Sequence, residues 1–304
     1  MPPAEATGGE AGAAHGAYAQ PTPRLLYVHD DLTGEVATGF GPASLAAALT
    51  RSLFELLGRD RERVVILTLE DQLERVIAQG GHAPFDLALG IAAAGERVTL
   101  ALHARTGWFP RVRRLGLTRE EDGRGGYRLV STVPAPLPDQ LQGIAECRTL
   151  AVVDDTIFSG LTMRSVLEVL SPDLLSRTHA FCLRGVADSI AAVAKLCPLT
   201  AGVVAPGRIL EDVSFINASG LVRRGAIRRA GQASLAFFER PEWMEAWFPG
   251  YTEAIVKLCR ELHEAVEAPR ADRAPRTRRG SPAPSARPGS RRPGSSSHRS
   301  APGR

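Results

Sequence analysis

Short apolar runs alternate with amphipathic segments along most of the chain. The apolar runs have the length of buried strands, and the segments between them repeat apolar residues at helical spacing. This order of strand, helix and strand predicts an α/β fold in which a parallel sheet carries helices on both faces. The expected strands are 24–29, 63–67, 85–91, 149–153, 179–183 and 201–204, and the expected helices are 44–57, 70–78, 95–103, 162–170, 188–197 and 252–265.

Two of these helices carry more detailed signals. Thr68 is placed to cap the helix at 70–78, with Asp71 three residues further on. The helix at 44–57 places four leucines on one face, which predicts that this face is buried: Leu45, Leu49, Leu53 and Leu56.

Composition divides the chain into a folded part and two extensions. Residues 1–22 are rich in Ala, Gly and Pro, and residues 268–304 in Arg, Pro, Ser and Gly, so we expect both ends to be disordered. Residues 23–267 form the expected domain, ending in a small hood region of helical character at 205–267. The polar stretch 106–128 has no clear period and predicts a long loop or hairpin, a feature that is often functional.

The basic tail dominates the charge of the chain. The net charge is +4, but residues 270–304 hold ten arginines and one acid, so the remainder is acidic. No aromatic residue lies in this tail to stack on bases, so we expect no specific nucleic-acid partner. No apolar run approaches the ~18 residues of a membrane span, and the N-terminus lacks the pattern of a signal peptide. These features predict a cytoplasmic protein that does not bind membranes, and they leave open whether it is a homodimer.

The strongest chemical signal is the segment 150–162, LAVVDDTIFSGLT. An apolar strand brings two adjacent acids, Asp154 and Asp155, to its carboxyl end, where open α/β sheets bind ligands. A short loop with hydroxyl side chains and a glycine then enters a helix, and such a helix start suits a phosphate group. Carboxylates can accept hydrogen bonds from vicinal hydroxyls. The pattern therefore predicts a site for a ribose 5-phosphate.

This segment resembles the ribose-phosphate signature of type I phosphoribosyltransferases, in which four apolar residues and two acids precede a Thr/Ser-Gly-x-Thr/Ser loop. By that resemblance Asp154 and Asp155 are the catalytic residues and hold the ribose hydroxyls. Phe158 differs from the Thr or Ala that is frequent at its position. The residues implied to bind 5-phosphoribosyl 1-pyrophosphate (PRPP) are Thr156, Ile157, Phe158, Ser159, Gly160, Leu161 and Thr162.

The resemblance also implies a reaction. A phosphoribosyltransferase moves ribose 5-phosphate from PRPP to a nitrogen or another nucleophile of a nucleobase-like or other small acceptor, and pyrophosphate leaves. The implied cofactor is Mg²⁺, held mainly by the substrate and not by a set of protein ligands.

Further candidates come from the positions that match other parts of such enzymes. Pyrophosphate would lie at the strand-to-helix turn, and the arginines of the loop at 106–128 would approach it when the loop closes. Phe215 is the candidate for stacking on the acceptor. The turn candidates are Ala92, Ala93, Ala94, Gly95 and Arg97, and the loop candidates are Arg111, Arg113, Arg114 and Arg119.

Two other interpretations stay open. The alanine-rich turn favours a regulatory protein that binds PRPP without catalysis. A receiver-like or kinase-like α/β domain is the other alternative, since Asp30-Asp31-Leu32-Thr33-Gly34 resembles a short signature of sugar-acid kinases.

Overall fold

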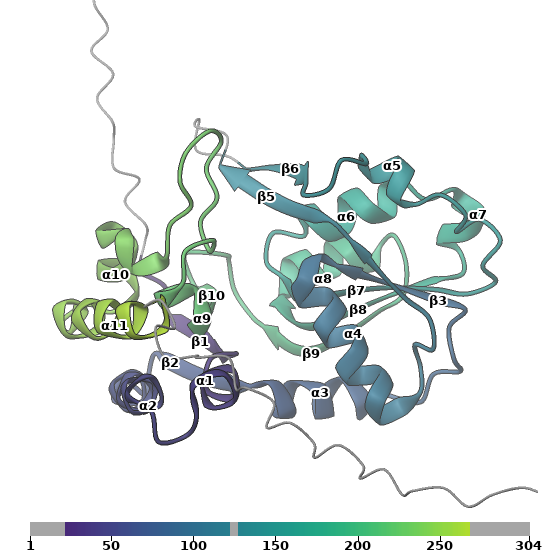
Figure 1. Ribbon diagram of the computed structural model, residues 1–304. Helices are drawn as coiled ribbons and strands as arrows, with labels where there is room; N and C mark the ends of the chain where they lie inside the picture. Colours follow the sequence, from purple (N-terminus) through teal and green to yellow (C-terminus); the bar gives the residue numbers. More distant parts are fainter. Residues whose placement is uncertain (1–21, 122–126, 268–304) are drawn as a thin grey trace, which may run out of the picture. The chain divides into compact units, whose positions relative to one another are not determined.

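The computed structural model describes residues 22–121 and 127–267 of the chain. The predicted tails therefore lie outside the described residues, apart from Thr22. Five parallel strands form the larger part of the fold: β3 (Leu87–Ile91), β4 (Val112–Leu115), β7 (Leu150–Ile157), β8 (Thr178–Val186) and β9 (Leu199–Ala205). They make one sheet in the order β4-β3-β7-β8-β9 (Figure 1). The predicted α/β class is thus confirmed.

Helices cover both faces of this sheet because its strands are apolar on both sides. The covering helices are α3 (Leu69–Ile77), α4 (Ala92–Thr106), α6 (Leu161–Glu168) and α8 (Ala187–Ala194). In β7, Leu150 and Val152 pack toward α6 and α8, whereas Ala151 and Val153 pack toward α3 and α4. This alternation is the period of two that any strand imposes on its side chains.

A second parallel sheet brings distant parts of the chain together. Its strands are β1 (Leu25–Asp30), β2 (Val64–Thr68) and β10 (Val213–Asn217), in the order β10-β1-β2 (Figure 1). The sequence indicated the first two of these strands but not that they leave the main sheet to pair with a strand near residue 215. One face is covered by helices, and the other meets the carboxyl ends of β8 and β9. The helices of this part are α1 (Thr33–Phe40), α2 (Leu45–Leu57), α9 (Ala218–Val222), α10 (Pro241–Trp247) and α11 (Thr252–Glu267).

The stretch 106–128 is more regular than a loop. Its first part is the edge strand β4, and its second part begins an antiparallel hairpin of β5 (Leu117–Glu121) and β6 (Tyr127–Ser131). Buried Leu115 and Leu117 anchor the two strands although arginines surround them. Residues 122–126 lie outside the described part. The remaining short elements are α5 (Leu137–Gln140), α7 (Pro172–Leu175) and η1 (Phe237–Glu239).

The two detailed helix predictions had different outcomes. Thr68 caps α3, since its hydroxyl accepts the N–H of Asp71 at 3.1 Å. The buried face of α2 was predicted wrongly at one position, because Leu45 is 69% exposed. Ser44 is the N-cap, so Leu45 is the first helical residue and points away from the core. The buried residues of α2 are Ala46, Ala47, Thr50, Leu53 and Leu57.

Glycines allow α4 to lie very close to the main sheet. A Cβ atom at Gly95 would overlap the carbonyl oxygen of Val153 and approach the Cα atom of Asp154 to 3.3 Å. A Cβ atom at Gly90 would lie 2.6 Å from the backbone of Glu96. The position of α4 against β7 therefore depends on the absence of these side chains. None of the described helices combines the length and the apolar character needed to cross a membrane.

We expect Gly95→Ala to lower the free energy of unfolding by about 1–3 kcal/mol, since its methyl group must displace backbone atoms of β7. Gly34→Ala is the matched control: Gly34 lies in α1, and a methyl group added there would meet no atom within 4 Å. At this position, alanine should raise the free energy of unfolding by roughly 0.5–1 kcal/mol. Urea denaturation measures the free energy of unfolding of both variants. Equal changes in the two variants would contradict the close approach of α4 to β7 at Gly95.

Candidate functional site

A cavity of about 940 Å³ opens at the carboxyl end of β7. Its walls come from β7 and the loop after it, the first turn of α4, the hairpin strand β5, the edge strand β10, and the segment from α9 to α10. Both predicted acids line it. From the predicted phosphate segment, Thr156, Ile157, Phe158, Gly160, Leu161 and Thr162 line it as well.

The loop after β7 is shaped for an anion. Gly160 has a φ of 75°, a left-handed conformation that favours glycine, and α6 begins at the next residue. The hydroxyl of Ser189 donates to the carbonyl of Phe158 at 2.7 Å and fixes the other end of the loop. Ser159 does not line the cavity, and its hydroxyl accepts the N–H of Leu161 at 3.4 Å. The next N–H groups of the first turn of α6, those of Thr162 and Met163, have no helical acceptor and are available as donors to a ligand.

The two acids have different surroundings. Asp155 accepts a hydrogen bond from the Arg184 guanidinium at 3.0 Å and from the Thr156 hydroxyl at 3.0 Å. Burial acts to raise the pKa of Asp155, but the charge of Arg184, an electrostatic contribution from His29 and side-chain hydrogen bonds with Thr156 and Asp154 together outweigh it, so this pKa lies below its ordinary value. Asp155 is therefore ionised at neutral pH.

Asp154 is bonded to no cation in the described part of the chain. Its carboxylate accepts the backbone N–H of Asp155 at 2.8 Å, and the residue is 9% exposed. Burial and the negative charge of Asp155 raise the pKa of Asp154 well above its ordinary value, although Arg119 opposes this at longer range. Such a pair of acids with diverging pKa values is typical of functional sites.

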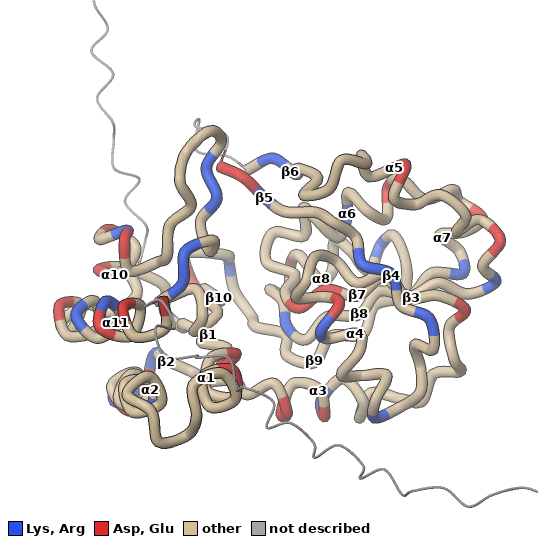
Figure 2. The backbone as a smooth tube through the Cα atoms, in the orientation of Figure 1, with Lys and Arg blue, Asp and Glu red and all other residues tan. Residues whose placement is uncertain are grey.

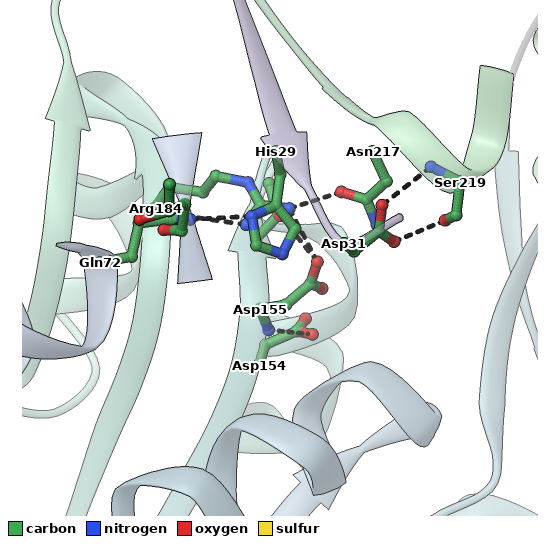
Figure 3. Close-up of polar contacts among 10 residues, drawn as sticks. His29, Asp31, Gln72, Asp154, Asp155, Arg184, Asn217 and Ser219 are labelled. Atoms are coloured by element: carbon green, nitrogen blue, oxygen red, sulfur yellow. Dashed lines mark hydrogen bonds and ion pairs between the residues drawn. The ribbon is translucent and has the colours of Figure 1, made fainter. Parts of the chain in front are cut away.

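Arg184 is the centre of a buried network that the sequence did not predict (Figure 3). Besides Asp155, its guanidinium donates to Asn217 at 2.6 Å and to Gln72 at 3.1 Å. The side-chain amide of Gln72 lies 2.8 Å from Nδ1 of His29. Burial and then the charge of Arg184 lower the pKa of His29 to about 4. The only sequence signal for this network is a single arginine within the apolar strand β8.

The predicted pyrophosphate turn is only partly at the cavity. Ala92 and Ala94 line it, and Ala92 begins α4 with a φ of 54°, which is unusual for a residue with a side chain. Ala93 and Arg97 do not line it, and Gly95 packs against β7. The first turn of α4 thus offers backbone N–H groups but no cation.

Of the four predicted loop arginines, only Arg119 lines the cavity. Arg113 donates instead to the carbonyls of Gln140 and Gln142, and Arg114 pairs with Glu96 at 3.5 Å. Arg111 is exposed to solvent and does not line the cavity. The structure thus brings only Arg119 of this group to the cavity, because Arg113 and Arg114 lie in the edge strand β4 and Arg111 directly precedes it.

The far wall of the cavity is aromatic and basic. Phe215 lines it and stacks on Tyr27, with ring centroids 4.9 Å apart. Figure 2 shows basic residues along the segment between α9 and η1. Most arginines of this wall are paired: Arg223 with Glu35, Arg224 with Glu239, and Arg240 with Glu121. The other large side chains are Phe237, Trp243 and Trp247.

The two acids of the segment 30–34, Asp30 and Asp31, accept hydrogen bonds from backbone N–H groups. Asp30 accepts the N–H groups of Leu32 and Thr33 at the start of α1. Asp31 accepts the N–H of Ser219 at 2.8 Å and also bonds its hydroxyl, so it fixes α9 beside the cavity. These contacts give both acids a structural role.

A dedicated metal cage is not evident in the described part of the chain, where no three His, Cys, Asp or Glu side chains converge. The nearest arrangement is the pair Asp154 and Asp155, of which one is already bonded to Arg184. Mg²⁺ is commonly bound through one or two carboxylates together with substrate phosphates. The residues present therefore fit an ion that arrives with a phosphorylated ligand.

Comparison with known proteins gives structural similarity only. No family model matches the chain, and no curated protein matches it. Among solved structures, it is similar to a purine phosphoribosyltransferase from Pyrococcus horikoshii (16% identity, 55% of this chain and 86% of that chain, TM-score 0.27). It is also similar to the xanthine-guanine-hypoxanthine phosphoribosyltransferase of Helicobacter pylori (18% identity, 48% of this chain and 86% of that chain, TM-score 0.31).

A third similar structure is the orotate phosphoribosyltransferase of Aeropyrum pernix (19% identity, 44% of this chain and 70% of that chain, TM-score 0.29). These proteins belong to the family that the segment 150–162 resembles. Since all three TM-scores are below 0.5, the function of this chain has to be argued from its own site.

The burial of neutral His29 predicts a loss of stability in acid. Its pKa is about 4 in the folded protein and ordinarily 6.5, so folding opposes its protonation. Above pH 6.5, His29 is neutral in the folded and the unfolded state and does not affect the free energy of unfolding. As the pH falls from 6.5 toward 4, its protonation in the unfolded state lowers the free energy of unfolding by about 3 kcal/mol. His29→Gln should remove this part of the pH dependence in urea denaturation at pH 7 and pH 5. A variant with the same acid-dependent loss as the wild type would contradict the assignment.

Proposed function

We propose that this protein is a phosphoribosyltransferase that binds PRPP at the segment 150–162 and transfers ribose 5-phosphate to an acceptor in the same cavity. One observation carries the proposal: two adjacent carboxyls with opposite pKa shifts lie at the end of β7, just before the glycine loop that leads into α6. Vicinal hydroxyls next to a phosphate are the ligand chemistry that fits this pair of features.

The 5-phosphate would bind to the N–H groups at the start of α6 and to the hydroxyl of Thr162, which lines the cavity. This position puts the ribose hydroxyls beside Asp154 and Asp155. The anomeric carbon then faces the centre of the cavity. Such fixed orientation of reactants is a large part of catalysis in reactions that need little covalent help from protein.

The leaving pyrophosphate would lie between the first turn of α4 and Arg119. Backbone N–H groups of that turn and the Arg119 guanidinium supply positive potential on two sides. Mg²⁺ bound to the pyrophosphate would neutralise its charge. As the bond from the anomeric carbon to the pyrophosphate oxygen breaks, that oxygen retains the electron pair, and the acceptor forms its bond to the same carbon with inversion and loses a proton.

The acceptor would lie against the aromatic wall. Phe215 is held flat by its stack on Tyr27, and Phe237, Trp243 and Trp247 enlarge the apolar surface. A planar, nucleobase-like molecule suits this wall. Other small nucleophiles of similar size are also candidates.

A regulatory protein that binds PRPP without turnover is the second candidate. The first turn of α4 favours it, because Ala92 and Ala94 place no cation beside the pyrophosphate. The two candidates share the same ligand and differ in whether pyrophosphate is released.

The full chain, incubated with Mg²⁺, PRPP and a panel of nucleobases, should release pyrophosphate with at least one acceptor. Asp154→Asn should reduce the rate at least tenfold, since it replaces one of the two carboxyls that we propose hold the ribose hydroxyls. Thr38→Val, an exposed change in α1, is the control and should leave the rate unchanged. PRPP binding without release on every acceptor would favour the regulatory protein, and no binding would exclude both.

Arg119→Gln should weaken PRPP binding roughly tenfold to hundredfold, the effect of losing a charge-assisted hydrogen bond. Arg114→Gln removes an arginine of the same stretch that is paired with Glu96 and does not line the cavity. That control should change the affinity by less than about twofold. Calorimetric titration with PRPP and Mg²⁺ measures both, and equal losses would remove Arg119 from the proposed site.

A further inference from the structure

The aromatic wall of the cavity has two parts, which lie on opposite faces of β10. Successive side chains of a strand point to opposite sides of its sheet. Phe215 belongs to the cluster between the small sheet and the carboxyl ends of β8 and β9. Ile216 belongs instead to the core cluster on the helix side, which also contacts Phe237, Trp243 and Trp247. A planar ring that stacks on Phe215 therefore does not reach the second part of the wall.

We call this second part the aromatic lobe. Phe237 lies against both tryptophans, with ring centroids 5.9 Å from Trp243 and 5.1 Å from Trp247. Gly220 allows this ring to pack on α9, since a Cβ atom there would lie 2.6 Å from it. The rings hold one another in place and form a surface that suits a flat apolar group. The residues of the lobe all line the cavity: Ser214, Ile216, Gly220, Phe237, Trp243 and Trp247.

One polar atom of the aromatic lobe lacks a partner. Ser214 is 2% exposed, and its hydroxyl has no hydrogen-bond partner among the residues that the structure describes. An unbonded hydroxyl in the interior is costly, and such groups are rare in folded proteins. Ser214 points to the same side of β10 as Ile216, and it lines the cavity. A ligand in the aromatic lobe can therefore supply the missing partner.

The boundary between the two parts of the wall is the free edge of β10. This strand pairs only with β1 in the small sheet. The N–H of Leu25 in β1 donates to the carbonyl of Asp212 at 2.9 Å, and the parallel register continues this bonding through Ser214 and Ile216. The backbone N–H and carbonyl of Phe215 therefore lie on the free side of the strand. A polar group of a ligand that crosses this edge finds a donor and an acceptor there.

The charge beside the aromatic lobe is compensated. The guanidinium of Arg240 lies over the ring of Trp243, 5.3 Å from its centroid. It pairs with Glu121 at 2.8 Å and with Glu242 at 3.2 Å. Two carboxylates against one guanidinium leave no excess positive charge for an anionic group. Because the burial of an unpaired charge is costly, an uncharged group fits the aromatic lobe.

We propose that the aromatic lobe binds an uncharged aromatic substituent of the acceptor, while the nucleobase-like ring of the same molecule stacks on Phe215. The two rings are joined across the edge of β10 by a polar link that bonds to the hydroxyl of Ser214. This inference rests on the proposed function, since it describes the acceptor of that reaction. It makes Ser214 a residue that determines specificity, and it makes the acceptor larger than a simple nucleobase.

Adenine and a benzyladenine that carries its benzyl group on the exocyclic nitrogen are matched probes, because the second adds a ring through an N–H link. In calorimetric titrations of the full chain, with and without PRPP and Mg²⁺, benzyladenine should bind at least about tenfold more tightly than adenine. Trp243→Leu and Ser214→Ala should each reduce this preference about fivefold. Leu100→Ala, an exposed change in α4 that does not line the cavity, is the control and should keep it.

Two further measurements locate the second ring. The chain has three tryptophans, so in Trp108→Phe the remaining two both lie in the aromatic lobe, and benzyladenine should change their fluorescence more than adenine does. The melting temperature tests whether the hydroxyl of Ser214 is structural. Because that hydroxyl is unbonded within the described fold, Ser214→Ala should keep or raise the melting temperature. A fall of more than about 4 °C would overturn the role of Ser214 in specificity.

Equal affinities for adenine and benzyladenine, or no binding of either probe, would overturn the inference. A preference for benzyladenine that Trp243→Leu leaves unchanged would also overturn it, since the second ring would then lie elsewhere. Wild-type protein that neither binds PRPP nor releases pyrophosphate would overturn the proposed function, whatever its affinity for benzyladenine. The two failures are therefore distinct.

Discussion

The guanidinium of Arg184 is a charge that folding has removed from water, and both sheets are arranged around the need to satisfy it. Its partners come from the main sheet, from the small sheet and from α3. Removing one partner of such a buried pair commonly destabilises a protein by about 3–5 kcal/mol. The junction between the sheets therefore combines this polar contact with the apolar cluster around Val186, Ala205 and Val213.

This junction explains why a ligand site lies where it does. The carboxyl end of β7 is not sealed by apolar packing, because the carboxylate of Asp155 and the guanidinium keep polar groups there. The cavity that results has donors at one end, where α6 begins, and aromatic rings at the other. Its two ends share the Asp155–Arg184–Asn217 contact, so the chemistry of one end is not independent of the shape of the other.

The sequence by itself determined the α/β class, most strands of the main sheet and the segment 150–162. These features are local, since a run of adjacent residues specifies the strand, the acids and the loop. It did not determine the second sheet, the exposure of Leu45 or the separation of Arg119 from Arg113 and Arg114. The second sheet and the place of each arginine depend on pairing between strands that are distant in the chain, for which one sequence has no local signal.

Only the tertiary structure decided the environment of the two acids. Asp154 and Asp155 are the same residue type side by side, and they differ because Arg184, 29 residues after Asp155, pairs with Asp155 alone. Asn217 and Gln72, which are 33 and 112 residues from Arg184, bond the same guanidinium. Burial and charge act through space, so the pKa values of adjacent identical side chains diverge only after the chain has folded. The sequence therefore determined that two acids precede the loop and the helix start, and the fold decided that only Asp155 is paired with a buried cation.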